Sequence, residues 1–163
     1  MDIRVEIQNL NKLMDAFSRA PEEVKRQMRL ALLVALRDVK EYAQRVHRFR
    51  TRSGDLERSI ETEITNDWPP TGRIWLNPAT TMTKTGKSYG TYVHDGTPPH
   101  EIKPVNRKAL RWVKGNAFVF SKKVKHPGTA KDPFIYQAAE AERENINGVF
   151  DRYTDIAIRK AGL

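Results

Sequence analysis

Residues 21–47 constrain the fold more than any other segment, because they predict one long helix. Pro21 suits the first turn of a helix, and Glu22 and Glu23 favour the positive end of the helix dipole. Apolar side chains then recur at helical spacing: Val24, Met28, Ala31, Leu32, Ala35, Val39, Tyr42, Ala43 and Val46. Residues 30–36 are apolar on nearly all sides, so we expect the domain itself or a neighbouring subunit to cover more than one face of this helix.

Shorter patterns predict the remaining elements. Residues 3–7 alternate apolar and charged side chains, which is typical of a half-buried strand. Asn9 or Asn11 is a candidate cap for a short helix with four apolar residues on one face: Leu10, Leu13, Met14 and Phe17. Residues 50–54 end the long helix, and strands are expected at 60–65, 73–76, 89–94, 109–113 and 117–124. A final helix is expected after Pro133, interrupted near Gly148.

These elements predict a single α+β domain over residues 1–163, in which an antiparallel sheet packs against a long N-terminal-half helix and a C-terminal helix. A chain of this length can bury a real core. Residues 78–90 are polar, with four Thr and one large aliphatic-type residue, Met82. We therefore predict a mobile loop at 78–90, because ordering it would bury little apolar surface.

Composition excludes several classes of site. The chain contains no Cys, which excludes disulfides, thiolate metal ligands and cysteine nucleophiles. No apolar run approaches the roughly 20 residues that a membrane helix needs. The first residues alternate charged and apolar side chains and do not resemble a signal peptide, so we expect a protein made in the cytoplasm with no membrane partner.

The formal net charge of +9 is concentrated in one segment. Nine basic residues and no acidic ones occur between positions 103 and 131: Lys103, Arg107, Lys108, Arg111, Lys114, Lys122, Lys123, Lys125 and Lys131. The rest of the chain carries equal numbers of basic and acidic residues. Such a segment could face DNA phosphates or an acidic protein surface, or it could simply be solvated. We slightly favour a partner-facing role and take Lys103, Arg107, Lys108, Arg111, Lys122, Lys123 and Lys125 as the candidate residues.

No motif gives a sharp signal for catalysis. The run Gly86, Lys87, Ser88 resembles the end of a phosphate-binding loop, but Thr81 stands where that loop needs Gly. We also expect neither the buried strand before it nor the helix after it that such a loop requires.

Asp95 and Glu101 with Lys103 resemble the acidic pair and lysine of metal-dependent nucleases, in which carboxylates hold Mg²⁺. Prolines at positions 98, 99 and 104 argue against a strand that presents both acids. The four histidines, His47, His94, His100 and His126, are interpreted as surface or turn residues. We therefore expect no catalytic residues, no metal and no cofactor.

Three tryptophans have two interpretations. Trp68, Trp75 and Trp112 could stack on nucleic-acid bases beside the basic segment, or they could belong to the core. We favour the core for all three, and most clearly for Trp112.

An ordered set of short motifs resembles one protein family. The motifs are residues 50–60 (RTRSGDLERSI), 92–97 (YVHDGT), His100 with Lys103 and Pro104, 109–112 (ALRW), 118–120 (FVF), 124–129 (VKHPGT), 132–135 (DPFI) and Ala138. Together they resemble the tail-completion, or neck, proteins of long-tailed double-stranded DNA bacteriophages. Ser53-Gly54 stands where Thr-Gly is usual in that family. The resemblance covers roughly residues 3–139.

The recognised positions are mainly structural. Gly96 and Gly128 permit backbone angles that a Cβ resists, Pro133 fixes the start of the last helix, and Phe134 is expected to be buried. The resemblance implies a virion protein that helps join the tail to the DNA-filled head and is assembled in the host cytoplasm. It implies a ring of identical copies, taken as a hexamer, that contacts the head connector, the tail tube or tail terminator, and the genomic DNA in the lumen.

Other functions stay open from the sequence. A tail terminator or another minor tail protein is close in role. A basic nucleic-acid-binding domain explains the charge but not the ordered Gly and Pro motifs, and a metal-dependent nuclease explains least.

Overall fold

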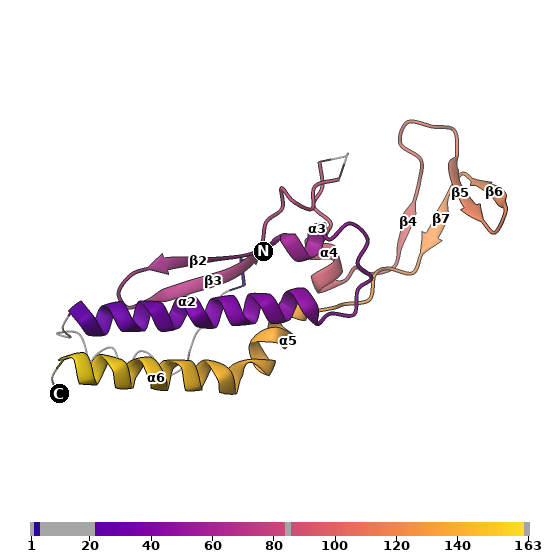
Figure 1. The fold of residues 1–163 in the computed structure, drawn as a ribbon. Helices are drawn as coiled ribbons and strands as arrows, with labels where there is room; N and C mark the ends of the chain where they lie inside the picture. Colours follow the sequence, from indigo (N-terminus) through magenta and orange to yellow (C-terminus); the bar gives the residue numbers. More distant parts are fainter. Residues whose placement is uncertain (1, 4–21, 84–85, 162–163) are drawn as a thin grey trace.

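The computed structural model describes residues 2–3, 22–83 and 86–161, and it is an α+β fold, as the sequence predicts (Figure 1). The long helix α2 spans Glu22–Arg45, and the C-terminal helix α6 spans Arg143–Ala161. The strands β1 (Asp2–Ile3), β3 (Thr71–Leu76) and β2 (Ile60–Asn66) form an antiparallel sheet in that order. Figure 1 shows α2 between this sheet and α6, so the helix is covered on two sides by its own chain.

The main core lies where α2 meets the sheet and the short helix α5 (Phe134–Ala141). Its buried residues are Leu32, Leu36, Val39, Ala43, Leu56, Ile60, Ile74, Phe134, Ile135 and Ala138. A second cluster, Val24, Met28 and Ala157, joins α2 to α6. Within the apolar segment 30–36, Leu32 and Leu36 are buried, whereas Leu30 and Leu33 remain exposed on the outer face of α2. The chain therefore covers part of this segment and leaves one apolar strip bare.

Residues 97–131 form a projection that we call the arm (Figure 1). Strands β4 (His100–Ile102) and β7 (Val124–His126) pair antiparallel near the body of the molecule. Beyond them, β5 (Leu110–Lys114) and β6 (Ala117–Ser121) form a second two-stranded hairpin. The expected strand at 117–124 is thus two strands, because a turn in which Lys123 N donates to Ser121 Oγ (3.2 Å) separates them.

One expected strand is wrong. Residues 89–94 were expected to be extended, but α4 spans Gly90–Asp95. The buried positions of this segment are Gly90 and His94, which follow helical rather than alternating spacing. The approach of Leu56 and Thr81 to Gly90 leaves little room for a Cβ there, which shows how closely the helix packs. Tertiary packing therefore overrides the β propensity of Tyr92 and Val93.

The interruption of the C-terminal helix also lies elsewhere than predicted. The break falls at Glu142, between α5 and α6, and Gly148 lies inside α6. At Glu142 the chain turns so that α6 can run back along α2 (Figure 1). Gly148 is tolerated because its site is exposed and open, although glycine costs a helix about 0.5–1 kcal/mol relative to alanine.

Parts of the N-terminal prediction lie outside the described residues. Only Asp2–Ile3 of the expected strand at 3–7 overlaps the description, and Ile3 pairs with Ile74 of β3. The predicted short helix after Asn9 or Asn11, and Pro21 as the first residue of the long helix, lie outside the described residues. No helix in the described part of the chain is long and apolar enough to cross a membrane.

The segment 78–90 is anchored at both ends. Thr81 is buried, and its Oγ1 lies 2.6 Å from Ser88 Oγ. Met82 and Ser88 form an antiparallel bridge, and Tyr89 N donates to Thr81 O. These contacts restrain the described ends of the segment, and the mobility of the loop stays a prediction.

Candidate functional site

Two glycines shape the base of the arm. Gly96 and Gly128 have φ of 75° and 91°, so both occupy the region that favours glycine. A Cβ on Gly128 would lie 2.2 Å from Thr97 O, and one on Gly96 would lie 2.8 Å from Thr129 O. Thr97 and Thr129 exchange backbone hydrogen bonds of 3.0 and 3.2 Å. The two glycines therefore allow the outgoing and returning chains to pair closely, as their predicted scaffold role requires.

Asp132 ties the base of the arm to the end of α2. Its buried carboxylate accepts hydrogen bonds from the backbone N–H groups of Arg48 (2.7 Å) and Phe49 (2.9 Å). The next residue, Pro133, caps α5, and its carbonyl accepts from Gln137 N (3.0 Å). The residues that follow α2 and the motif at 132–135, some 80 positions apart, thus meet through one side chain.

Phe134 lies at the centre of this junction. Its side chain is fully buried, as predicted, and contacts the rings of Phe49 (centroids 5.1 Å apart) and His94 (5.2 Å) edge-on. The prediction that the histidines are surface or turn residues is wrong for His94, which is fully buried. His94 Nδ1 lies 2.7 Å from Asp95 Oδ1, and its Nε2 has no hydrogen-bond partner among the described residues. Helix α4 turns His94 inward, and a strand-based prediction could not show this.

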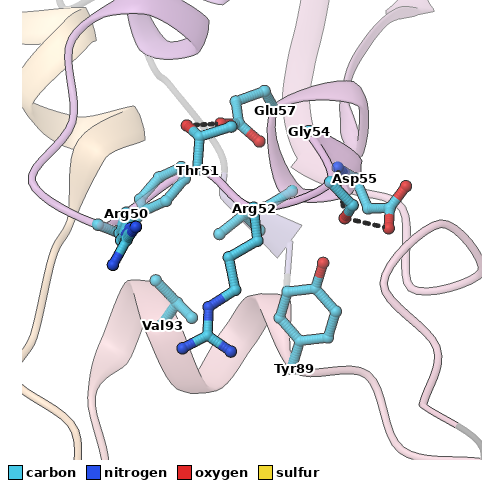
Figure 2. A pocket seen from close by; sticks show the side chains of 11 residues that line it. Arg50, Thr51, Arg52, Gly54, Asp55, Glu57, Tyr89 and Val93 are labelled. Atoms are coloured by element: carbon cyan, nitrogen blue, oxygen red, sulfur yellow. Dashed lines mark hydrogen bonds between the residues drawn. The ribbon is translucent and has the colours of Figure 1, made fainter.

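A half-open pocket of about 440 Å³ lies between the loop after α2 and α4 (Figure 2). Apolar side chains form part of its wall: Phe49, Leu56, Tyr89 and Val93. Arg50 and Arg52 line its exposed side, and in Figure 2 the Arg52 side chain extends toward α4 between Val93 and Tyr89. The acids of the pocket already have partners, because Thr51 donates to Glu57 and Ser53 donates to Asp55. Hydrogen bonds from Ser53 and Arg58 lower the pKa of Asp55.

The nuclease-like residues do not form a shared site. Asp95 is engaged by His94, whereas Glu101 forms ion pairs with Lys103 (3.2 Å) and Lys123 (3.4 Å) on the arm. No group of three or more His, Asp or Glu side chains in the described part of the chain is placed to hold a metal ion.

The phosphate-loop resemblance also lacks its geometry. A helix does follow at Gly90, contrary to expectation, but α4 has only six residues. Thr81, at the position that requires Gly, is buried and hydrogen bonded to Ser88. The side chain of Ser88 is therefore paired with Thr81 of the same segment.

All seven candidate basic residues lie on the arm, as the sequence segment requires, but they differ in their partners. Glu101 forms ion pairs with Lys103 and Lys123. Arg111 lies over the ring of Phe118, 4.8 Å from its centroid. No ion pair joins the other four, Arg107, Lys108, Lys122 and Lys125, to an acid of the described chain.

The expectation of core tryptophans holds only in part. Trp68 packs against the second core cluster, and Trp75 lies beneath the guanidinium of Arg73 (5.3 Å). Trp112 is 38% exposed on β5, so its assignment to the core is wrong: the arm projects from the body, and no other element of the described chain is layered on this hairpin.

Sequence reasoning missed two exposed aromatic residues on β6, Phe118 (61% exposed) and Phe120 (64%). A signal was present. Gly115-Asn116 between two apolar runs is a two-residue hairpin turn, which would have placed 109–113 and 117–121 in one hairpin.

Comparison of the chain with known protein families, curated proteins and solved structures found no match.

Proposed function

We propose that this chain is a structural virion protein, a ring-forming neck component that completes a phage tail and helps join it to the DNA-filled head. Its partners in this role are further copies of itself, taken as six, and the head-connector and tail-tube or tail-terminator proteins. The single observation that carries the proposal is the junction at the base of the arm. There, segments that resemble the neck family meet: Asp132 N donates to Val93 O, Phe134 contacts the ring of His94, and the two close-packed glycines let the chains at 97 and 129 pair.

The shape of the chain supports assembly with neighbours. Isolated two-stranded ribbons are marginally stable in water, yet this arm extends away from the body (Figure 1). The outer face of α2 also leaves Leu30 and Leu33 exposed at 38% and 42%. A neighbouring copy that covered these side chains would remove apolar surface from water. Cyclic contacts repeat such an interface and close without leaving a free adhesive edge.

Deleting the gene from a phage that carries it tests this function directly. We expect heads filled with DNA and complete tails that stay separate in electron micrographs, because the neck ring that connects them is missing. Plasmid-borne wild-type protein should restore joining. Infectious, correctly joined particles in the complete absence of this chain would refute the proposal.

A second experiment asks what the basic arm contacts within the neck. Reversing the charge of Lys122, Lys123 and Lys125 to Glu should block joining if these side chains dock protein. The same change should spare joining but impair DNA retention if they face the genome. The matched control replaces the three lysines by Arg, which keeps the charge and should support normal particles.

A further inference from the structure

The β5–β6 hairpin has two different faces. Directly opposed residues of an antiparallel pair lie on the same face, and the register places Arg111 opposite Phe120 and Val113 opposite Phe118. We call these four residues the aromatic face. The other face carries Leu110, Trp112 and Lys114 from β5 with Ser121, Val119 and Ala117 from β6.

The aromatic face is bare. Val113, Phe118 and Phe120 are 62%, 61% and 64% exposed, whereas Leu110 and Val119 on the opposite face are half-buried. Arg111 lies over the Phe118 ring, so a cation and a π-surface are already combined on this face. A contiguous exposed apolar patch on a protein surface often marks an interaction site.

A hollow of about 530 Å³ adjoins this face. It is lined by Arg107, Lys108, Ala109, Arg111 and Phe120, so three cations border one exposed ring. No ion pair links these three cations to an acid of the described chain, in contrast to Lys103 and Lys123, which share Glu101. Their charge is therefore not compensated within the arm, and an anionic ligand would meet little competition from the protein's own carboxylates.

We propose that the aromatic face and this hollow bind a single-stranded nucleic acid. Unpaired bases stack on Phe118 and Phe120, while Arg107, Lys108 and Arg111 neutralise the phosphates beside them. The two Phe residues are two positions apart on one strand, about 7 Å, so each ring can take a separate base. Phenyl rings carry no hydrogen-bonding groups, which makes the binding tolerant of sequence.

The rings distinguish a single strand from a duplex. Bases inside a duplex are stacked on each other and offer no free face to a protein ring, so a duplex would engage the basic residues alone. The acidic side chains of a peptide would likewise pair with the guanidinium groups, but they carry no flat ring system to cover Phe118 and Phe120. The inference uses the hairpin and the residues just before it and does not rest on the neck role, so either can fail without the other.

Fluorescence anisotropy with the full chain tests the proposal. The probes are a labelled oligothymidylate of about 20 nucleotides and a labelled duplex of the same length. We expect the single strand to bind more tightly than the duplex. With three phosphate contacts, the slope of log affinity against log salt should be near −2, a loss of roughly 20-fold between about 50 and 200 mM salt.

Variants on the aromatic face separate stacking from charge. Phe120→Leu keeps an apolar side chain but removes the ring, and we expect at least about fivefold weaker binding of the single strand. Tyr92→Leu removes an exposed ring from α4, outside the proposed site, and should stay within about twofold. Arg111→Gln should make the salt slope shallower by about 0.7, whereas Arg152→Gln, which removes an equal charge from α6, should leave it unchanged.

Three outcomes overturn the proposal: no binding of the oligothymidylate at the lower salt concentration, equal or tighter binding of the duplex, or an unchanged affinity of Phe120→Leu. Circular dichroism and the thermal midpoint should match the wild type for every variant, because the altered side chains are exposed. If Phe120→Leu fails to fold, the comparison of Arg111→Gln with Arg152→Gln decides, and equal salt slopes for the two variants reject the site.

Discussion

Replacing Phe134 by Ala should destabilise the fold more than most single changes, because this ring joins α5 to α2 and α4. Phe134 is fully buried, and truncating a buried Phe to Ala usually costs about 3–5 kcal/mol. Part of that cost is the loss of the edge-on contacts with Phe49 and His94, since such aromatic pairs contribute about 0.5–1.5 kcal/mol each. The free energy of unfolding of an ordinary domain is about 5–15 kcal/mol, so the variant would lose from about a fifth to all of it.

Urea unfolding followed by circular dichroism measures this cost. The free energy of unfolding should fall by about 3–5 kcal/mol and the thermal midpoint by roughly 6–20 °C. Phe134→Leu is the matched control: it keeps most of the apolar volume and should cost about 1–1.5 kcal/mol. A cost below about 1 kcal/mol for Phe134→Ala, with an unchanged dependence on urea, would mean that the junction is not held by this ring.

Three further perturbations probe the same scaffold. Gly128→Ala should lower the free energy of unfolding by about 1–3 kcal/mol, because the backbone is at positive φ and the new Cβ would meet Thr97 O. Gly148→Ala, in open space on α6, should raise it by about 0.5–1 kcal/mol. Urea unfolding compares the two variants, and equal effects would contradict the close approach at Gly128. Asp132→Ala should cost about 1.5–3 kcal/mol in urea unfolding, because two backbone N–H groups lose their charged acceptor. Arg48→Ala should cost less than about 1 kcal/mol, because its guanidinium is mostly exposed. A larger cost for Arg48→Ala than for Asp132→Ala would show that the ion pair dominates. Hydrogen bonds from Arg26 and Gln27 lower the pKa of Glu23 to about 2, so the stability that Glu23 contributes is present above its ordinary pKa of 4.5 and is lost as the pH falls toward 2. In urea unfolding at several pH values, Glu23→Gln should lose less stability over this window than the wild type. Identical pH profiles for the two proteins would exclude the contribution.

Local signals were sufficient to predict the framework. The helical spacing between residues 24 and 46 and the acidic first turn predicted α2, which begins at Glu22 and ends at Arg45. Pro133 and Phe134 predicted the start of α5. Gly96 and Gly128 were predicted to adopt backbone angles that a Cβ resists, and both have a positive φ. These features depend on backbone angles and spacing, which a single sequence carries directly.

Long-range packing decided what the sequence could not supply. Short apolar runs at 109–113 and 117–120 predict strands, but they do not say whether another layer covers either face of the hairpin. The arm leaves Trp112, Phe118 and Phe120 exposed because it projects beyond the body. Similarly, the burial of His94 depends on α4 packing against Phe134, which joins residues 40 positions apart.

The pocket beside α4 shows the same limit. No sequence pattern indicated that Arg50, Arg52 and Tyr89 line a pocket, and only the fold brings the loop after α2 against α4 (Figure 2). Most of the basic candidates, by contrast, could be found from charge alone, because nine cations in one segment without an acid are visible without a structure. Which of them are neutralised depends on Glu101, whose partners only the fold reveals.

The most direct test of the account is an electron cryomicroscopy reconstruction of the particle that contains this chain. We predict a closed ring of six copies between the head connector and the tail, with each arm reaching a neighbouring subunit or the lumen. Single copies without contacts to one another, or copies placed away from the head–tail junction, would contradict it.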